Sequence, residues 1–176
     1  MSNVASNKNA TMYGTKKRRF MKKLQPGDNA PSFSLLSQDG SVVSLDDYRQ
    51  RRIVLYFYPK DFTPGCTTQA CDLRDEIVAG SVKNSEIVGI SSDPPEVHKR
   101  FSEEYGLHFT LLSDPDNEVM KAYGAYGEKM NYGKTVVGVI RSTFIIGPDQ
   151  KIESAFYAVK AKGHATRLVN NLNRAT

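Results

Sequence analysis

The chain holds two cysteines, Cys66 and Cys71, which lie five residues apart in one short stretch. A β-branched and aromatic run at residues 53–58 precedes them and predicts a buried strand. Thr63 and Pro64 are typical of an N-cap and of a first helical position. We therefore expect a helix that begins at Pro64, with Cys66 in its first turn.

The first turn of a helix favours a thiolate over a thiol. Its backbone N–H groups lack intrahelical partners, and the helix dipole makes the potential there positive. Because the thiolate is the nucleophilic form, Cys66 is a candidate nucleophile. A small buried side chain with only a packing role is the alternative, but the Thr63–Gly65 segment exposes backbone donors beside the sulfur and favours reactivity. The apolar face continues until Gly80, where the helix is expected to stop, through Ala70, Leu73 and Ile77.

The spacing of Cys66 and Cys71 limits what they can do together. Five residues of α-helix separate two Cα atoms by roughly 8.7 Å, whereas a disulfide needs them within about 7 Å. The pair cannot bond while the helix is intact, so either the thiols are unrelated or the helix unwinds between two chemical states. Zinc is a third possibility, but a single C-x4-C pair matches zinc spacing poorly.

Arg141 lies within an apolar run, residues 136–146, which predicts one long strand. An unpaired charge is costly to bury, so Arg141 must reach solvent, pair with an acid or serve an anion. The pattern alone favours structural pairing, although a thiolate at Cys66 is one such anion.

The histidines lie outside any motif, and we expect them at the solvated surface or at helix ends. A cysteine hydrolase would need one of them as a base beside Cys66. Nothing in the local sequence indicates that arrangement. The three are His98, His108 and His164.

Charge is unevenly distributed along the 176 residues. The formal net charge is +5, but residues 1–23 hold seven Lys or Arg and no acid, which leaves 17 basic against 19 acidic side chains elsewhere. We expect a disordered basic tail at 1–20 and one domain at 21–176. The basic cluster at 16–19 could contact nucleic acid, yet a solvated leader is the simpler interpretation, and we expect no nucleic-acid partner.

Composition also bears on the compartment. No apolar run approaches the length of a membrane span, and no apolar segment in the tail resembles a secretory signal. Two cysteines are too few for a secreted disulfide scaffold. We expect a cytoplasmic protein without a membrane partner.

The order of elements predicts an α/β domain with a mixed sheet. Asp39-Gly40 separates two short apolar runs and predicts an N-terminal hairpin. Alternating strands and helices follow, and a final hairpin and helix close the chain. The expected strands are 33–36, 42–45, 53–58, 86–91, 109–112, 136–146 and 151–157, and the expected helices are 64–79, 95–105, 114–123 and 163–172.

These motifs resemble those of the peroxiredoxins. Pro59-x-x-x-Thr63-x-x-Cys66 matches the active-site signature of that family, and Cys66-x4-Cys71 matches its Q-type branch, the bacterioferritin comigratory proteins. The resemblance runs from about Leu24 to the C-terminal helix. It includes the segments 56–60, 89–93, 109–114, 133–135 and 141–146.

The resemblance implies a thioredoxin-like fold, a central mixed sheet flanked by helices, and a thiol-dependent peroxidase. Cys66 would be the peroxidatic and Cys71 the resolving cysteine, joined in an intramolecular disulfide that thioredoxin or a similar dithiol reduces. Thr63 would bond the thiolate and the peroxide substrate, Pro59 would shield the pocket, and Arg141 would stabilise both. No metal, haem or flavin is implied.

We expect a monomer, because one helix holds both cysteines. Two alternatives stay open at this point: a binding or chaperone-like module that uses the basic tail, and a cysteine hydrolase.

Overall fold

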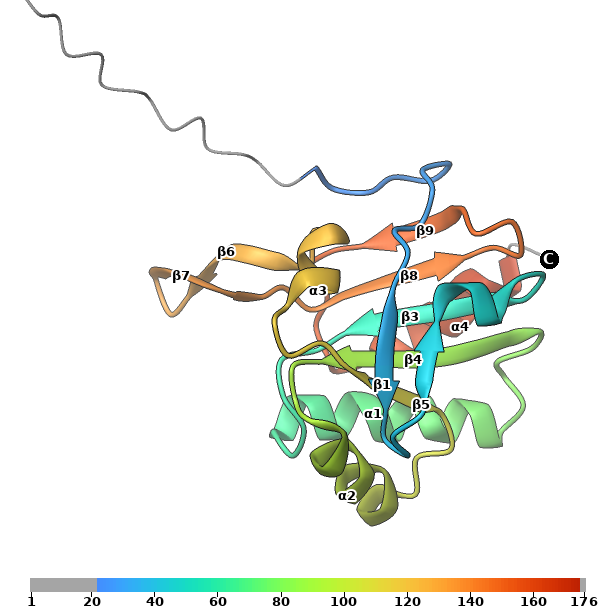
Figure 1. Cartoon of the computed structure of the whole chain (residues 1–176), viewed down its shortest axis with the longest axis horizontal. Helices are drawn as coiled ribbons and strands as arrows, with labels where there is room; N and C mark the ends of the chain where they lie inside the picture. The colour runs from blue at the N-terminus through green and yellow to red at the C-terminus, as the bar shows by residue number, and fades with distance from the viewer. Residues whose placement is uncertain (1–21, 175–176) are drawn as a thin grey trace, which may run out of the picture.

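The computed structural model describes residues 22–174 (Figure 1). The prediction of a disordered tail at 1–20 and the start of the predicted domain at residue 21 lie outside these residues. Within 22–174, no helix has the length and apolar character needed to span a bilayer.

A seven-stranded mixed sheet forms the centre of the fold, in the order β2-β1-β5-β4-β3-β8-β9. Strands β3, β4 and β5 are parallel, and the outer pairs are antiparallel. The predicted N-terminal hairpin is present as β1 and β2. The strands are β1 (Ser34–Ser37), β2 (Val42–Ser44), β3 (Arg52–Phe57), β4 (Ser85–Ser91), β5 (Thr110–Ser113), β8 (Ser142–Ile146) and β9 (Ile152–Phe156).

Helices lie on both faces of this sheet, and the α-helices agree with the predicted positions within a few residues. The predicted helix at 114–123 is shorter than expected, because its first residues form a turn in which the Asn117 N–H bonds the carbonyl of Asp114 at 3.0 Å. The helices are η1 (Leu45–Tyr48), α1 (Pro64–Val78), α2 (Pro95–Tyr105), α3 (Glu118–Ala122) and α4 (His164–Arg174).

The sheet separates two apolar clusters, because successive side chains of a strand point to opposite faces. Ile53, Leu55 and Phe57 of β3 pack with η1, α3 and β1 on one face. Val54 and Tyr56 pack with α1, α2 and α4 on the other. Cys66 belongs to the second cluster.

One strand prediction is wrong. The expected strand at 136–146 is divided into β7 (Lys134–Val139) and β8, which lie in different sheets. The chain bends between them, where the Ile140 N–H bonds the carbonyl of Ala125 at 2.7 Å. The other half of this separate hairpin, β6 (Tyr126–Asn131), was not predicted, because it is polar and has no apolar periodicity. The hairpin projects from the body at the end where α1 begins (Figure 1).

Candidate active site

The start of α1 follows the sequence prediction. Thr63 is the N-cap, with φ −76° and ψ 148°, and Pro64 is the first helical residue. The side chain of Thr63 does not cap the helix; its hydroxyl donates to the Lys60 carbonyl at 2.8 Å instead. The loop from Pro59 to Thr63 thus connects β3 to α1 and stabilises itself by a local hydrogen bond.

The end of α1 is also as predicted, and Gly80 terminates the helix. Its φ of 71° lies in the left-handed region, which glycine adopts without steric cost. The N–H groups of Gly80 and Ser81 then satisfy two of the last helical carbonyls, at 2.9 and 3.0 Å. Both cysteines therefore lie within one continuous helix, and both are free thiols.

Cys66 is buried at the beginning of α1, with 2% of its surface exposed, among the apolar side chains on one face of the sheet. The guanidinium of Arg141 donates from Nη2 to Cys66 Sγ across 3.3 Å. A cation at this distance stabilises a thiolate, and the first helical turn does the same. Two independent sources of positive potential therefore converge on this sulfur.

Arg141 reaches Cys66 from the bend between β7 and β8. The prediction placed it inside a strand, but the structure places it just before β8, where its backbone carbonyl accepts the Val159 N–H at 3.0 Å. The side chain is half-buried and contacts Cys66 and Gln69. The sequence left three roles open for Arg141: reaching solvent, pairing with an acid or binding an anion. Its contact with the Cys66 sulfur fits the binding of an anion better than structural pairing with an acid.

Gln69 is a site residue that sequence reasoning missed. Its side chain is fully buried, and its Oε1 accepts a hydrogen bond from Arg141 Nη1. Because Gln69 is three residues after Cys66, the two share a helical face. A polar residue on this otherwise apolar face was the signal that could have indicated a role. Gln69 orients the guanidinium, so that its other terminal nitrogen faces the sulfur.

The remaining predicted residues lie near Cys66 without hydrogen-bonding to it. Pro59 is half-buried in the loop before α1, and Thr63 is half-exposed at the N-cap. Cys71 is half-buried further along the same helix. The structure thus brings Cys66 and Arg141 into contact, and it places the other three in the preceding loop, at the N-cap and further along α1.

The expectation of a solvated surface or a helix end is wrong for His98, whereas His164 does lie at a helix end, although it is buried there. His98 is fully buried, and its Nδ1 lies 2.6 Å from Asp61 Oδ2. His164 is buried at the start of α4, with Nε2 2.8 Å from the Thr143 hydroxyl. Burial, and then the nearby Arg167 and Arg141, lower the pKa of His164 to about 4. Only His108 is exposed.

These contacts bear on the hydrolase alternative. The ring nitrogens of His98 face Asp61 and the Leu112 carbonyl, so neither is available to Cys66. In the described part of the chain the one side-chain hydrogen bond to Cys66 Sγ comes from Arg141. Nor do the described residues contain a group of three or more His, Cys, Asp or Glu side chains placed to hold a metal ion.

Tyr56 completes the buried surroundings of Cys66. Its hydroxyl has no hydrogen-bond partner among the described residues. Burial raises the pKa of Tyr56 well above its ordinary value, and the charges of Asp61 and Cys66 raise it further. Tyr56 therefore remains protonated and cannot serve as a base.

Residues 26–155 match the model of the AhpC/TSA family. A putative peroxiredoxin of Mycobacterium tuberculosis is 55% identical over 151 residues, which are 86% of this chain and 96% of that protein. Peroxiredoxin Bcp of Escherichia coli is 46% identical over 150 residues, which are 85% and 96% of the two chains.

Solved structures agree with the sequence comparison. A cysteine mutant of PrxQ from Xylella fastidiosa superposes with a TM-score of 0.80 at 34% identity, over 88% of this chain and 98% of that one. A mutant of peroxiredoxin Q from Xanthomonas campestris gives 0.76 at 35% identity, over 82% and 92%. The predicted thioredoxin-like fold is thereby confirmed. The chain belongs to the AhpC/TSA family and, within it, to the Q-type peroxiredoxins, also called bacterioferritin comigratory proteins.

Proposed function

We propose that this peroxiredoxin reduces hydrogen peroxide and organic hydroperoxides with Cys66 as the nucleophile and Cys71 as the resolving thiol. The observation that carries the proposal is the 3.3 Å contact between Arg141 Nη2 and Cys66 Sγ at the beginning of α1. Membership of the family supports peroxide reduction in general. The roles proposed for Cys66 and Arg141 rest on this contact, and those proposed for Cys71, Thr63 and Pro59 rest on the family resemblance.

In the first step the Cys66 thiolate attacks the terminal oxygen of the hydroperoxide. A sulfur–oxygen bond forms, the oxygen–oxygen bond breaks, and the leaving alkoxide or hydroxide takes up a proton to become alcohol or water. Cys66 is oxidised by two electrons to a sulfenic acid. Arg141 and the N–H groups of the first turn of α1 stabilise the negative charge that moves from sulfur to the leaving oxygen. Thr63 and Pro59 lie in the adjoining loop, where Thr63 would bond the peroxide and Pro59 would exclude water.

In the second step the Cys71 thiol attacks the sulfur of the sulfenic acid. A disulfide forms between Cys66 and Cys71, and the sulfenic oxygen leaves as water. Since five helical residues hold the two Cα atoms too far apart to bond, the first turns of α1 must unwind. A partner dithiol such as thioredoxin then reduces the disulfide and is itself oxidised.

Forming the disulfide needs neither a second copy of this chain nor a bound cofactor. Both cysteines come from one helix, so a monomer suffices. Both must be returned to thiols after each turnover, which fits a reducing, cytoplasmic environment. The basic residues before position 22 take no part in this mechanism, and we assign them to a tail outside the catalytic domain.

Peroxide consumption measured with a dithiol reductant tests the proposal. The wild type should turn over repeatedly, Cys66→Ser should consume no peroxide, and Cys71→Ser should consume about one equivalent before stopping when thioredoxin is the sole reductant. A Cys66→Ser variant that retained turnover would refute the assignment. Multiple turnover by Cys71→Ser with thioredoxin alone would show that resolution does not require Cys71. The same samples, tested with ester and amide substrates, decide the hydrolase alternative.

A further inference from the structure

A buried polar cluster joins the loop that leads into α1 to helix α2, and the mechanism above does not use this cluster. Asp61 and His98 are joined by a 2.6 Å contact between Oδ2 and Nδ1, and neither side chain is exposed to solvent. The Tyr58 hydroxyl donates to Asp61 Oδ1 at 2.6 Å. Buried titratable groups are rare unless they are paired, so this cluster requires an explanation.

The geometry determines where the protons of the cluster lie. His98 Nε2 is 3.1 Å from the Leu112 carbonyl, which can only accept, so Nε2 carries a hydrogen. One further proton must then lie between Nδ1 and the Asp61 carboxyl group. Burial raises the pKa of Tyr58 well above its ordinary value, so its hydroxyl remains a donor. Both carboxyl oxygens are thus satisfied, and removing one partner would leave a buried polar group unpaired.

The backbone around Asp61 is held just as firmly. Its N–H donates to Asp93 Oδ2 at 2.9 Å, and the same oxygen accepts the Ser91 hydroxyl at 2.8 Å. Asp61 is therefore fixed to the end of β4 through its main chain and to α2 through its side chain. The adjoining loop cannot move without disrupting one of these contacts.

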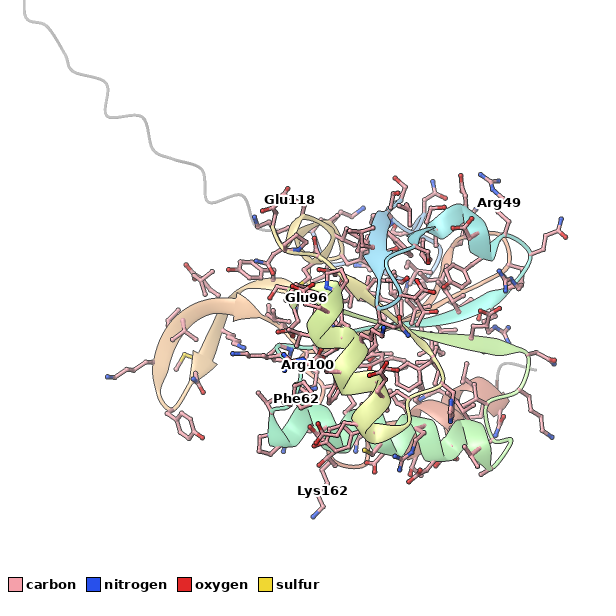
Figure 2. The ribbon with its side chains drawn as sticks, turned by 60° about the horizontal axis from the view of Figure 1, so that its bottom comes forward. Arg49, Phe62, Glu96, Arg100, Glu118 and Lys162 are labelled. Carbon is pink, nitrogen blue, oxygen red and sulfur yellow. The ribbon has the colours of Figure 1, made fainter. Side chains whose placement is uncertain are left out.

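The next residue, Phe62, shows why such support is needed. Its φ of 62° lies in the left-handed region, which a non-glycine residue adopts only when its surroundings enforce it. Its ring packs edge-on against Phe101 of α2, with centroids 5.1 Å apart, and lies 6.2 Å from the ring of Tyr105. Figure 2 shows Phe62 at the beginning of α1, beside α2. Helix α2 thus holds two consecutive residues of the loop.

We propose that Asp61 and His98 are positioning residues, which hold the loop 59–63 in the conformation that the reaction of Cys66 with peroxide requires. Pro59 lies two residues before Asp61, and Thr63, the N-cap of α1, lies two residues after it. A shift of Asp61 therefore displaces both sides of the peroxide site. This proposal rests on the proposed function, since it concerns the peroxide step.

The experiment compares Asp61→Ala with Asp61→Asn in rapid-mixing measurements of sulfenic acid formation. Alanine removes both side-chain contacts, and the peroxide step should slow by roughly ten- to a hundredfold, as expected for a displacement of about 1 Å. Asparagine can donate from its amide to Nδ1 of a neutral His98 and accept from Tyr58. It should therefore restore the rate to within about threefold of wild type, and a proton NMR signal from the His98 ring should remain protected from exchange.

Asp114→Ala is the matched control. Asp114 is also a buried carboxylate, and it accepts the Met120 N–H at 2.9 Å, away from the loop. This variant should lose thermal stability but keep the wild-type rate of sulfenic acid formation. A second pair covers the case in which Asp61→Ala does not fold. Tyr58→Phe should slow the peroxide step by roughly threefold, whereas Tyr123→Phe, which loses a bond to the Pro31 carbonyl, should not.

Three results would overturn the proposal: an unchanged rate in Asp61→Ala, equal slowing in Asp61→Ala and Asp114→Ala, or no recovery in Asp61→Asn. If Asp61→Ala does not fold, equal rates for Tyr58→Phe and Tyr123→Phe would overturn it. Failure of the proposed function looks different, because the wild type itself would then not consume peroxide. In that case hydrogen exchange still tests the positioning role: the amides of residues 61–63 should lose protection in Asp61→Ala and keep it in Asp61→Asn.

Discussion

Replacing Arg141 tests the contact on which the proposed chemistry depends. In Arg141→Ala the Cys66 sulfur loses its charged donor at 3.3 Å. A hydrogen bond to a charged group contributes about 1.5–3 kcal/mol. If this bond acts fully on the charge that develops in the transition state, the peroxide step should slow by roughly 10- to 150-fold, since 1.36 kcal/mol corresponds to a factor of ten. Stability should fall by about 1–3 kcal/mol, because the buried Gln69 carbonyl oxygen loses its donor.

Arg141→Lys separates charge from geometry. The arginine fork reaches Cys66 with one terminal nitrogen and Gln69 with the other. A lysine presents a single ammonium, which cannot reproduce both contacts in their present directions. We therefore expect a rate between those of the alanine variant and the wild type.

Stopped-flow detection of sulfenic acid formation, under pseudo-first-order conditions, measures this step apart from reduction of the disulfide. Arg52→Ala is the matched control, because Arg52 is a largely buried arginine that pairs with Glu153 and does not contact Cys66. It should change stability without changing the peroxide step. Full peroxide reactivity in Arg141→Lys, or equal slowing in Arg52→Ala, would refute direct participation of Arg141.

Two further predictions concern conformation and pH. Oxidation should remove hydrogen-exchange protection from the amides of residues 66–71, because the proposed disulfide requires α1 to unwind, while the strand at 53–57 stays protected. An oxidised protein whose helix stays protected through both cysteines would show that resolution comes from another molecule. Stability should fall as the pH drops from about 6.5 to about 4, because the unfolded His164 takes up a proton in this window and the folded one does not. The free energy of unfolding, measured with denaturant at each pH, should fall by at most about 3 kcal/mol, and this fall should be smaller in His164→Gln. An unchanged pH profile in that variant would contradict the assignment to His164.

Local signals were sufficient to predict the helix that bears the cysteines. The apolar run before it, the Thr63-Pro64 start and the Gly80 stop each act within a few residues, and the structure reproduces all three. The role proposed for Cys66 was suggested by the same local chemistry together with the family resemblance. Partners that are distant in the sequence were harder to predict. Arg141 reaches Cys66 because the chain bends before β8, and apolar periodicity does not show this bend.

His98 illustrates a different reason for failure. The pattern of α2 identified an apolar face through Phe101, and His98, three residues earlier, lies on that same face. We expected it at the surface because it lies outside any motif, on a helix that the sequence indicates to be partly exposed. Its burial becomes favourable only when Asp61, 37 residues away in the chain, lies opposite its ring. Sequence alone places Asp61 beside Lys60 and does not show that only the aspartate is turned inward.

The division of the interior by the sheet has a consequence for how this protein can open. Cys66, Ala70 and Leu73 of α1 pack only into the cluster on one face. The side chains of Ile53, Leu55 and Phe57 on the opposite face have their own partners. Unwinding the first turns of α1 therefore exposes apolar surface from one half of the core, and the other half continues to hold the strands in register. In the cycle proposed above, the cooperative unit that melts is therefore smaller than the domain, and the protein can change shape repeatedly without approaching global unfolding.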